Sequence, residues 1–132
     1  MSEILFDPPR DAPWIAPYWA GVDAGEWRMP HCANCGRWIW YPQAGAATCC
    51  GAPLTWHPLS GRGQLFTWTR VHHSFLPDAK APYLTGLIVP DEAPYVRIAA
   101  RLVCEGNPTI GGPVQLAFDD GAGGRVPYFI VE

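Results

Sequence analysis

Hydrophobic and polar positions alternate most clearly in the second half of the chain. After Gly61, runs rich in Thr, Val and aromatic residues are separated by turns that contain Gly or Pro, and they cover residues 63–75, 82–90, 95–103, 113–120 and 125–132. Such runs are typical of short β-strands. Five strands separated by turns predict a small closed β-barrel, because closure removes the exposed edges of a sheet.

The run at 95–103 alternates most regularly. Successive side chains of a strand point to opposite faces, so one face is predicted to carry Val96, Ile98, Ala100 and Leu102. The opposite face then carries Arg97, Ala99, Arg101 and Val103. Both arginines would therefore lie on one side of the predicted barrel.

The segment before the cysteines, residues 14–28, lacks a strand pattern and contains the best helical candidate. Pro17 suits the first turn of a helix, because its missing N–H costs nothing there, and Gly25 suits the end of a short helix. Tyr18, Trp19 and Val22 are then predicted to share one face. This face is aromatic and needs a surface to pack against.

The composition fits one compact domain with a small appendage. The chain has 132 residues, of which 48% are hydrophobic, and its seven Trp, five Tyr and five Phe suffice to fill a core. Fifteen Pro and fourteen Gly exclude long helices over most of the chain. The formal charge is −3, and Lys80 is the single lysine. A protein that mainly binds nucleic acid backbone usually has a basic surface, so this charge counts against that role.

The N-terminal residues 1–13 are rich in Pro and acidic residues, which predicts an arm lying on the surface or on a partner. They contain no apolar segment typical of a signal peptide. No stretch of the chain approaches the roughly eighteen apolar residues of a membrane-spanning helix. We therefore expect a cytoplasmic protein, in which Cys32 and Cys35 are metal ligands or redox groups rather than a disulfide.

Four of the five cysteines lie in the segment HCANCGRWIWYPQAGAATCCG, residues 31–51, between the aromatic, hairpin-like runs 37–41 and 54–57. Cys32 and Cys35 have the spacing of a metal-binding turn, whereas Cys49 and Cys50 are adjacent and need a local bend to reach one metal. Three interpretations remain open. The first is a structural zinc ion held by Cys32, Cys35, Cys50 and, less directly, Cys49. The second is a ribbon without metal that its aromatic residues hold together, and the third is a redox pair, for which the expected βαβ context is missing.

The other candidate groups give weaker signals. His31 adjoins Cys32 and is at most a substitute ligand, and Cys104 is predicted to be an inert buried thiol. His72 and His73 adjoin in a predicted strand, so one should face inward and the other outward. No nucleophile motif accompanies them, and we assign no catalytic residue. Gly61-Arg62-Gly63 is either a loop over a phosphate or, as we favour, a turn between two modules.

The order of these motifs resembles one protein family. The chain reads YW-x-G-x-x-x-G-x-W-x-x-P-x-C-x-x-C-G from Tyr18 to Gly36, followed by YP, CG, W-x-x-x-x-G-x-G, FTWTRVHHSF and PY. This order resembles the DUF35 family from about Trp14 to Val131. The family's third cysteine falls on Ala47, and Cys49 lies two places later.

The resemblance implies a mainly β fold. It consists of an N-terminal helical hairpin, a rubredoxin-like zinc ribbon and a C-terminal OB-fold barrel of five strands. On this basis we divide the chain into an arm with a short helix at 1–28, a zinc-ribbon-like module at 29–58 and an OB-fold domain at 59–132.

The resemblance also implies a function. Members of the family look like non-catalytic subunits of acyl-CoA enzymes: thiolases, lipid-transfer-protein-type thiolases or aldolases, or MaoC-like enoyl-CoA hydratases in lipid, steroid or polyketide-type metabolism. The implied assembly is heteromeric, with no membrane partner. The cations available for the phosphates of CoA are Arg62, Arg70, Arg97, Arg101 and Lys80. The aromatic residues expected at the partner interface are Trp14, Tyr18, Trp19 and Trp27.

The sequence leaves two alternatives to the function of an accessory subunit. A protein that binds single-stranded nucleic acid could stack bases on Phe66 and Trp68, since OB-folds and ribbons both serve that purpose, but the sequence lacks a basic groove. A free-standing enzyme would have to use His72 or His73.

Overall fold

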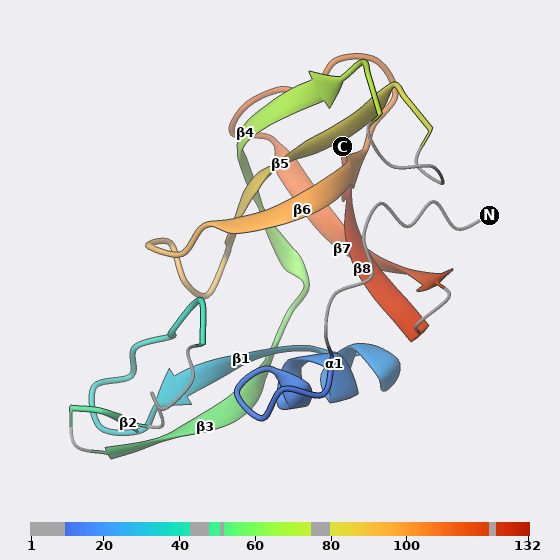
Figure 1. Cartoon of the computed structure of the whole chain (residues 1–132). Helices are drawn as coiled ribbons and strands as arrows, with labels where there is room; N and C mark the ends of the chain where they lie inside the picture. The colour runs from blue at the N-terminus through green and yellow to red at the C-terminus, as the bar shows by residue number, and fades with distance from the viewer. Residues whose placement is uncertain (1–9, 43–47, 51, 75–79, 122–123) are drawn as a thin grey trace.

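The computed structural model describes residues 10–42, 48–50, 52–74, 80–121 and 124–132 (Figure 1). Its elements are α1 (Ala16–Asp23), β1 (Trp27–Cys32), β2 (Thr48–Cys49), β3 (Ala52–Leu59), β4 (Arg62–Val71), β5 (Tyr83–Pro90), β6 (Ile98–Val103), β7 (Pro113–Gly121) and β8 (Gly124–Val131). The strands form a three-stranded sheet and a closed barrel. The predicted mainly β fold is confirmed.

The barrel contains β4 to β8 in the order β4-β5-β6-β8-β7. Neighbouring strands are antiparallel except for β6 and β8, which run parallel. The barrel closes where Gly63 of β4 pairs with Val114 of β7. A Cβ atom added to Gly63 would overlap the carbonyl oxygen of Val89, so the close approach of β4 and β5 requires glycine here. The five predicted strands and their closure are confirmed.

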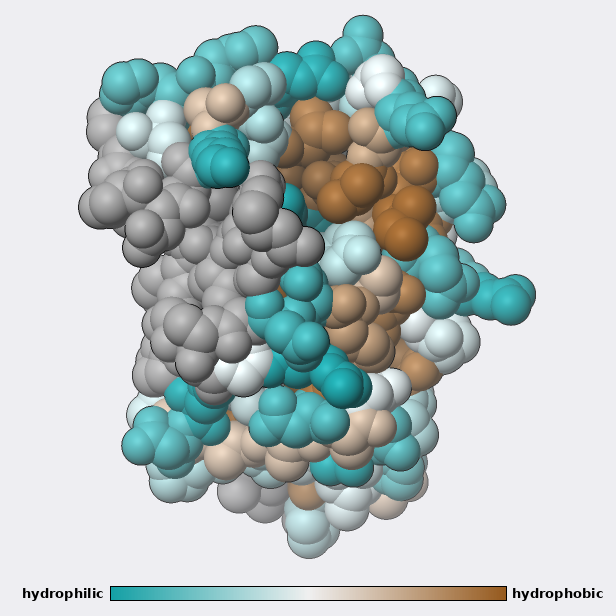
Figure 2. Space-filling model, turned by 90° about the vertical axis from the view of Figure 1, so that its right-hand side faces the viewer, coloured by the Kyte–Doolittle hydropathy of each residue, from teal (hydrophilic) through white to brown (hydrophobic). Residues whose placement is uncertain are grey.

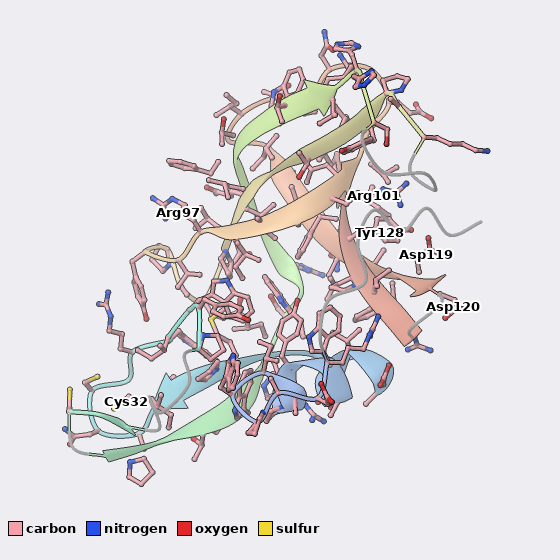
Figure 3. The ribbon with its side chains drawn as sticks, in the orientation of Figure 1. Cys32, Arg97, Arg101, Asp119, Asp120 and Tyr128 are labelled. Carbon is pink, nitrogen blue, oxygen red and sulfur yellow. The ribbon has the colours of Figure 1, made fainter. Side chains whose placement is uncertain are left out.

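The alternation predicted around β6 is also confirmed. Val96, Ile98 and Leu102 are buried, whereas Arg97, Ala99 and Val103 are exposed. The strand itself begins at Ile98, so Arg97 belongs to the preceding loop. Figure 3 shows Arg97 near the start of β6 and Arg101 farther along this strand. The guanidinium of Arg97 lies over the ring of Phe66 in β4, and the expectation that both arginines share one surface stays a prediction.

The ribbon is the smaller sheet, with the strand order β1-β3-β2. Strand β1 pairs with β3 from Trp27 opposite Leu59 to Cys32 opposite Leu54. The predicted hairpin-like run 37–41 contains only an isolated bridge between His31 and Trp38. The sequence did not predict β1, because both of its faces carry buried residues and its pattern does not alternate.

Helix α1 begins as predicted, with Pro17 in its first turn, and the chain leaves it through Gly25 at φ +80°. Among the described residues the N-terminal part forms this helix rather than a hairpin. Tyr18 and Val22 are buried, and Trp19 is half-buried under the guanidinium of Arg10, which lies 4.4 Å from the ring centroid. No helix in the described part of the chain is long and apolar enough to cross a bilayer.

One hydrophobic core connects the helix, the ribbon and the barrel. The indole of Trp27 in β1 packs against Phe129 in β8, with the ring centroids 5.2 Å apart. Trp27 is 1% exposed and Tyr18 is 7% exposed. The interface prediction is wrong for these two residues, because they fill the space between α1, β1 and the open end of the barrel. Trp14, which is 40% exposed, and Trp19 remain accessible candidates.

Candidate metal centre

The first cysteine turn follows the end of β1. Cys32 is fully buried, and its N–H donates to the carbonyl oxygen of Arg37 at 2.9 Å. The N–H of Gly36 donates back to the carbonyl oxygen of Cys32 at 2.8 Å, and Gly36 has φ +73°. Glycine adopts this left-handed conformation without strain. These two hydrogen bonds close the chain around Cys35 and turn both thiols of the predicted pair to the same side.

The second turn joins β2 to β3. Cys49 pairs with Ala52 across the two strands, and Cys50 lies in the turn that follows β2. Cys50 has φ 55°, a left-handed conformation that is uncommon for residues other than glycine. This is the local bend that two adjacent cysteines need, because it directs the side chain of Cys50 away from the extended line of β2. Strand β3 thus brings the second turn beside the first.

The sulfur atoms of Cys32, Cys35 and Cys50 all lie within 4.8 Å of one another. In a tetrahedral zinc site with Zn–S bonds of about 2.3 Å, ligand sulfurs are about 3.8 Å apart. The three thiols therefore fit such a site after a contraction of about 1 Å at most. Cys32 is buried while Cys35 and Cys50 are exposed, so the site lies at the surface of the ribbon's far end (Figure 3).

The remaining predicted ligands have different positions. The side chain of Cys49 lies outside the described residues, so its place as a fourth ligand stays a prediction. The ring of His31 instead packs against Trp38 and His57, with centroids 4.7 Å and 5.3 Å away, and is not part of the thiol cluster among the described residues. Cys104 is half-buried rather than buried, since it lies just after β6, and its thiol contacts the carbonyl oxygen of Glu105.

Burial also changes the pKa of one tyrosine in helix α1. Burial raises the pKa of Tyr18, and the nearby side chain of Trp27 lowers this pKa by a smaller amount. The phenol therefore stays neutral well above its ordinary pKa of about 10. A neutral, packed phenol is consistent with a structural role.

The predicted phosphate-binding cations do not form one site. Arg70 donates to Asn107 at 2.9 Å and to the carbonyl oxygen of Gly106. Arg62 lies at the other end of the same strand, on the order of 25 Å away at the usual rise per residue. Lys80 is exposed beyond β4. Contact of any one of these residues with CoA stays a prediction.

The two adjacent histidines lie beyond the end of β4 at Val71. His72 and His73 are both exposed. The prediction that one faces inward is wrong, because the strand ends before them and its alternation no longer applies. In contrast, the predicted turn between the two modules is present at Gly61, which has φ +85° and whose carbonyl oxygen accepts the N–H of Leu116 at 2.8 Å, whereas Arg62 and Gly63 already belong to β4.

A contact that the sequence did not predict joins the ribbon to the barrel. The N–H of Trp38 donates to the hydroxyl oxygen of Tyr95 at 2.6 Å, and the guanidinium of Arg37 lies 4.2 Å from the centroid of the same ring. These residues are 57 positions apart in the chain. No local pattern signals such a pairing, because it depends on how the two modules dock.

A cysteine-bearing ribbon that docks on a closed five-stranded barrel defines a zinc-ribbon/OB-fold protein. Two family models match this chain: the rubredoxin-like zinc ribbon domain of ChsH2 at residues 19–52, and the C-terminal OB-fold domain of ChsH2 at residues 56–119. The chain belongs to the DUF35 family, as the order of its motifs suggested.

Solved structures have the same fold. A chain of the Ltp2-ChsH2(DUF35) aldolase is similar with a TM-score of 0.80 and 21% sequence identity, covering 94% of this chain and 98% of that chain. A DUF35 family protein of unknown function from Sulfolobus solfataricus is similar with a TM-score of 0.62 and 14% identity, covering 92% of this chain and 87% of that one. No curated protein sequence matches significantly.

Proposed function

We propose that the chain is a non-catalytic accessory subunit of an acyl-CoA-processing enzyme. The observation that carries this proposal is the likeness, along almost the whole length of both chains, to the DUF35 chain of the Ltp2-ChsH2(DUF35) aldolase. One fold can serve several functions, so the shared place in an assembly is an inference by fold-level analogy, and the experiment below tests it. The partner is then an enzyme subunit of the aldolase, thiolase or hydratase type, and the substrate is an acyl-CoA thioester.

The surface supports a docking role. Large apolar side chains are exposed at several places, among them Trp14, Tyr41, Phe66, Val103 and Ile130. Val103 and Ile130 are paired in register across the parallel junction of β6 and β8. Figure 2 shows a cluster of apolar residues on one face of the molecule. Aromatic residues are enriched in the cores of protein interfaces.

We assign no catalytic residue to the chain. His72 and His73 are exposed just beyond the end of β4, and three of the cysteines are gathered into the metal-type cluster. A general base needs a partner group and a pocket. We therefore assign bond breaking to the partner enzyme.

Zinc is the cofactor that we propose for the ribbon. Cys32, Cys35 and Cys50 would hold it, with Cys49 as the candidate fourth ligand. A closed site of thiolates supplies folding free energy and no open position for substrate. The boundaries 1–28, 29–58 and 59–132 also stay a proposal, as does residence in the cytoplasm.

Co-purification from the native host tests the function. We expect a stoichiometric enzyme subunit to be retained with the chain and the complex to convert an acyl-CoA thioester, whereas the isolated chain does not. The Trp14→Ala variant removes an exposed ring of the proposed docking surface and should weaken retention of the enzyme subunit. Turnover by the purified monomeric chain, or the absence of any enzyme partner, would contradict the proposal.

A further inference from the structure

Two arginines lie over the faces of exposed aromatic rings. The guanidinium of Arg97 is 4.3 Å from the ring centroid of Phe66, and that of Arg37 is 4.2 Å from the centroid of Tyr95. Phe66 is 47% exposed and Tyr95 is 42% exposed. We call these four residues the arginine–aromatic surface. It includes the ribbon through Arg37 and the barrel through the other three residues.

A β-bulge places Phe66 on this surface. Leu65 pairs with Ile88 and Thr67 pairs with Leu87, so Phe66 is the extra residue between two neighbouring pairs. A bulge redirects a side chain that a regular ladder would orient differently. A large apolar ring is therefore held at the surface by the backbone, although it gains nothing from burial there.

The two guanidinium groups are held in place without an anionic partner among the residues that the structure describes. Nη1 of Arg97 donates to the carbonyl oxygens of Pro94 at 3.0 Å and Val96 at 3.3 Å, which leaves its Nε and Nη2 edge available. Within the described residues, neither Arg37 nor Arg97 has an acidic partner, although the chain has more acidic than basic residues. The two sites are close, since the Cα atoms of Tyr95 and Arg97 are at most about 7.6 Å apart.

We propose that the arginine–aromatic surface binds an acidic segment of the partner enzyme, with one carboxylate on Arg97 and a second on Arg37. This inference rests on the proposed function, because it names where the partner docks. A guanidinium edge binds a carboxylate with two parallel hydrogen bonds. The rings below it add apolar contact, and because the arginines are already held by stacking, little side-chain entropy is lost on binding.

The charge of the chain favours a protein over a nucleic acid at this surface. Two arginines on a chain of net charge −3 make too small a basic surface for a phosphate backbone, whose binding depends on several neutralised phosphates. Two carboxylates in one segment of a partner match two guanidinium groups.

Zero-length cross-linking in the co-purified complex tests this inference. The test is specific because the chain has very few side-chain amines that could react elsewhere. Lys80 is the single lysine, so a Lys80→Arg background removes the side-chain amines. Arg97→Lys and Arg37→Lys then each introduce one amine at the surface, which a carbodiimide joins to a carboxylate in ion-pair contact. Arg70→Lys is the matched control, because Arg70 lies at the far end of β4 and is held by Asn107 and Gly106.

We expect cross-linked peptides between acidic residues of the enzyme subunit and positions 97 and 37, and at least about tenfold fewer at position 70, since coupling requires the contact distance of an ion pair. In a titration with the purified partner, Arg97→Gln should weaken binding about tenfold or more. Both arginines are exposed, so thermal melting should show that the variants fold.

The contradicting outcomes are distinct. If the complex forms without cross-links at these positions and Arg97→Gln binds unchanged, this inference is wrong and the proposed function stands. If no enzyme subunit is retained, both are wrong. Cross-links between two copies of the chain, or oligonucleotide binding that Arg97→Gln abolishes, would assign the surface to a different partner and overturn the inference.

Discussion

The barrel and the far end of the ribbon differ in what holds them together. In the barrel every strand pairs with two neighbours, and Leu65, Ile88 and Phe129 are at most 2% exposed. At the far end of the ribbon β2 is two residues long, and Cys35 and Cys50 are exposed. The barrel is held by the core that it shares with the base of the ribbon, whereas the described part of the ribbon's tip has two exposed cysteines and three thiols that converge. The proposed zinc ion would stabilise the tip, while the hydrophobic core stabilises the rest.

The base of the ribbon, unlike its tip, is stabilised by the same hydrophobic core as the barrel. Trp27 and Met29 of β1 are almost completely buried in the common core. A change in the core should therefore unfold both modules together, and a change at the cysteines should affect only the tip. The predictions below test this distinction, from the largest expected effect to the smallest.

Phe129→Ala should lower the free energy of unfolding by about 3–5 kcal/mol, because it leaves a cavity between β8 and Trp27. Denaturant unfolding followed by tryptophan fluorescence measures this loss, and we expect barrel and ribbon base to unfold in one transition. Phe66→Ala is the matched control, since this ring is largely exposed and its removal should cost far less. Separate transitions for the two modules would contradict a common core.

Cys32→Ser should abolish zinc binding and open the tip of the ribbon while the barrel stays folded, because one of the converging thiolates is lost. Metal analysis should fall from about one zinc per chain to almost none, and amide exchange should quicken around residues 32–37. Cys104→Ser, which lies outside the cluster, is the control. Unchanged zinc content in Cys32→Ser would show that the cluster is not the metal site.

Tyr18 should make the core sensitive to alkaline pH. Its pKa in the folded state is raised, so above about pH 10 the unfolded chain loses the proton while the folded chain keeps it. The unfolded state then binds fewer protons, and stability falls with rising pH by up to about 1.4 kcal/mol per unit. Urea unfolding between pH 9 and 11 should show a smaller fall for Tyr18→Phe than for the wild type, whereas Tyr41→Phe, at an exposed position, should keep the full fall.

Tyr95→Phe should have the smallest effect, about 1 kcal/mol, because it removes the oxygen that accepts the N–H of Trp38. The amide of Trp38 should exchange faster in this variant. Tyr128→Phe is a suitable control, because its hydroxyl has no hydrogen bond among the described residues. An unchanged Trp38 amide would mean that ribbon and barrel are fixed to each other by the core alone.

The strands of the barrel were predictable because a strand with one buried face has a period of two, which Val96, Ile98 and Leu102 display. The helix was predictable from Pro17 and Gly25, which act locally. Strand β1 was missed because Met29 and Pro30 are buried on successive positions. A strand enclosed on both faces has no alternation to detect.

The sequence by itself determined the barrel, the short helix and the cysteines that could bind a metal, because each depends on periodicity or spacing between near neighbours. Only the tertiary structure decided that Tyr18 and Trp27 are buried, that the turn at Cys50 brings its sulfur to Cys32 and Cys35, and that Arg37 reaches Tyr95. These outcomes depend on how the ribbon packs against the end of the barrel. The physical reason is that burial and long-range contacts are properties of two surfaces together, and no short stretch of either surface specifies them.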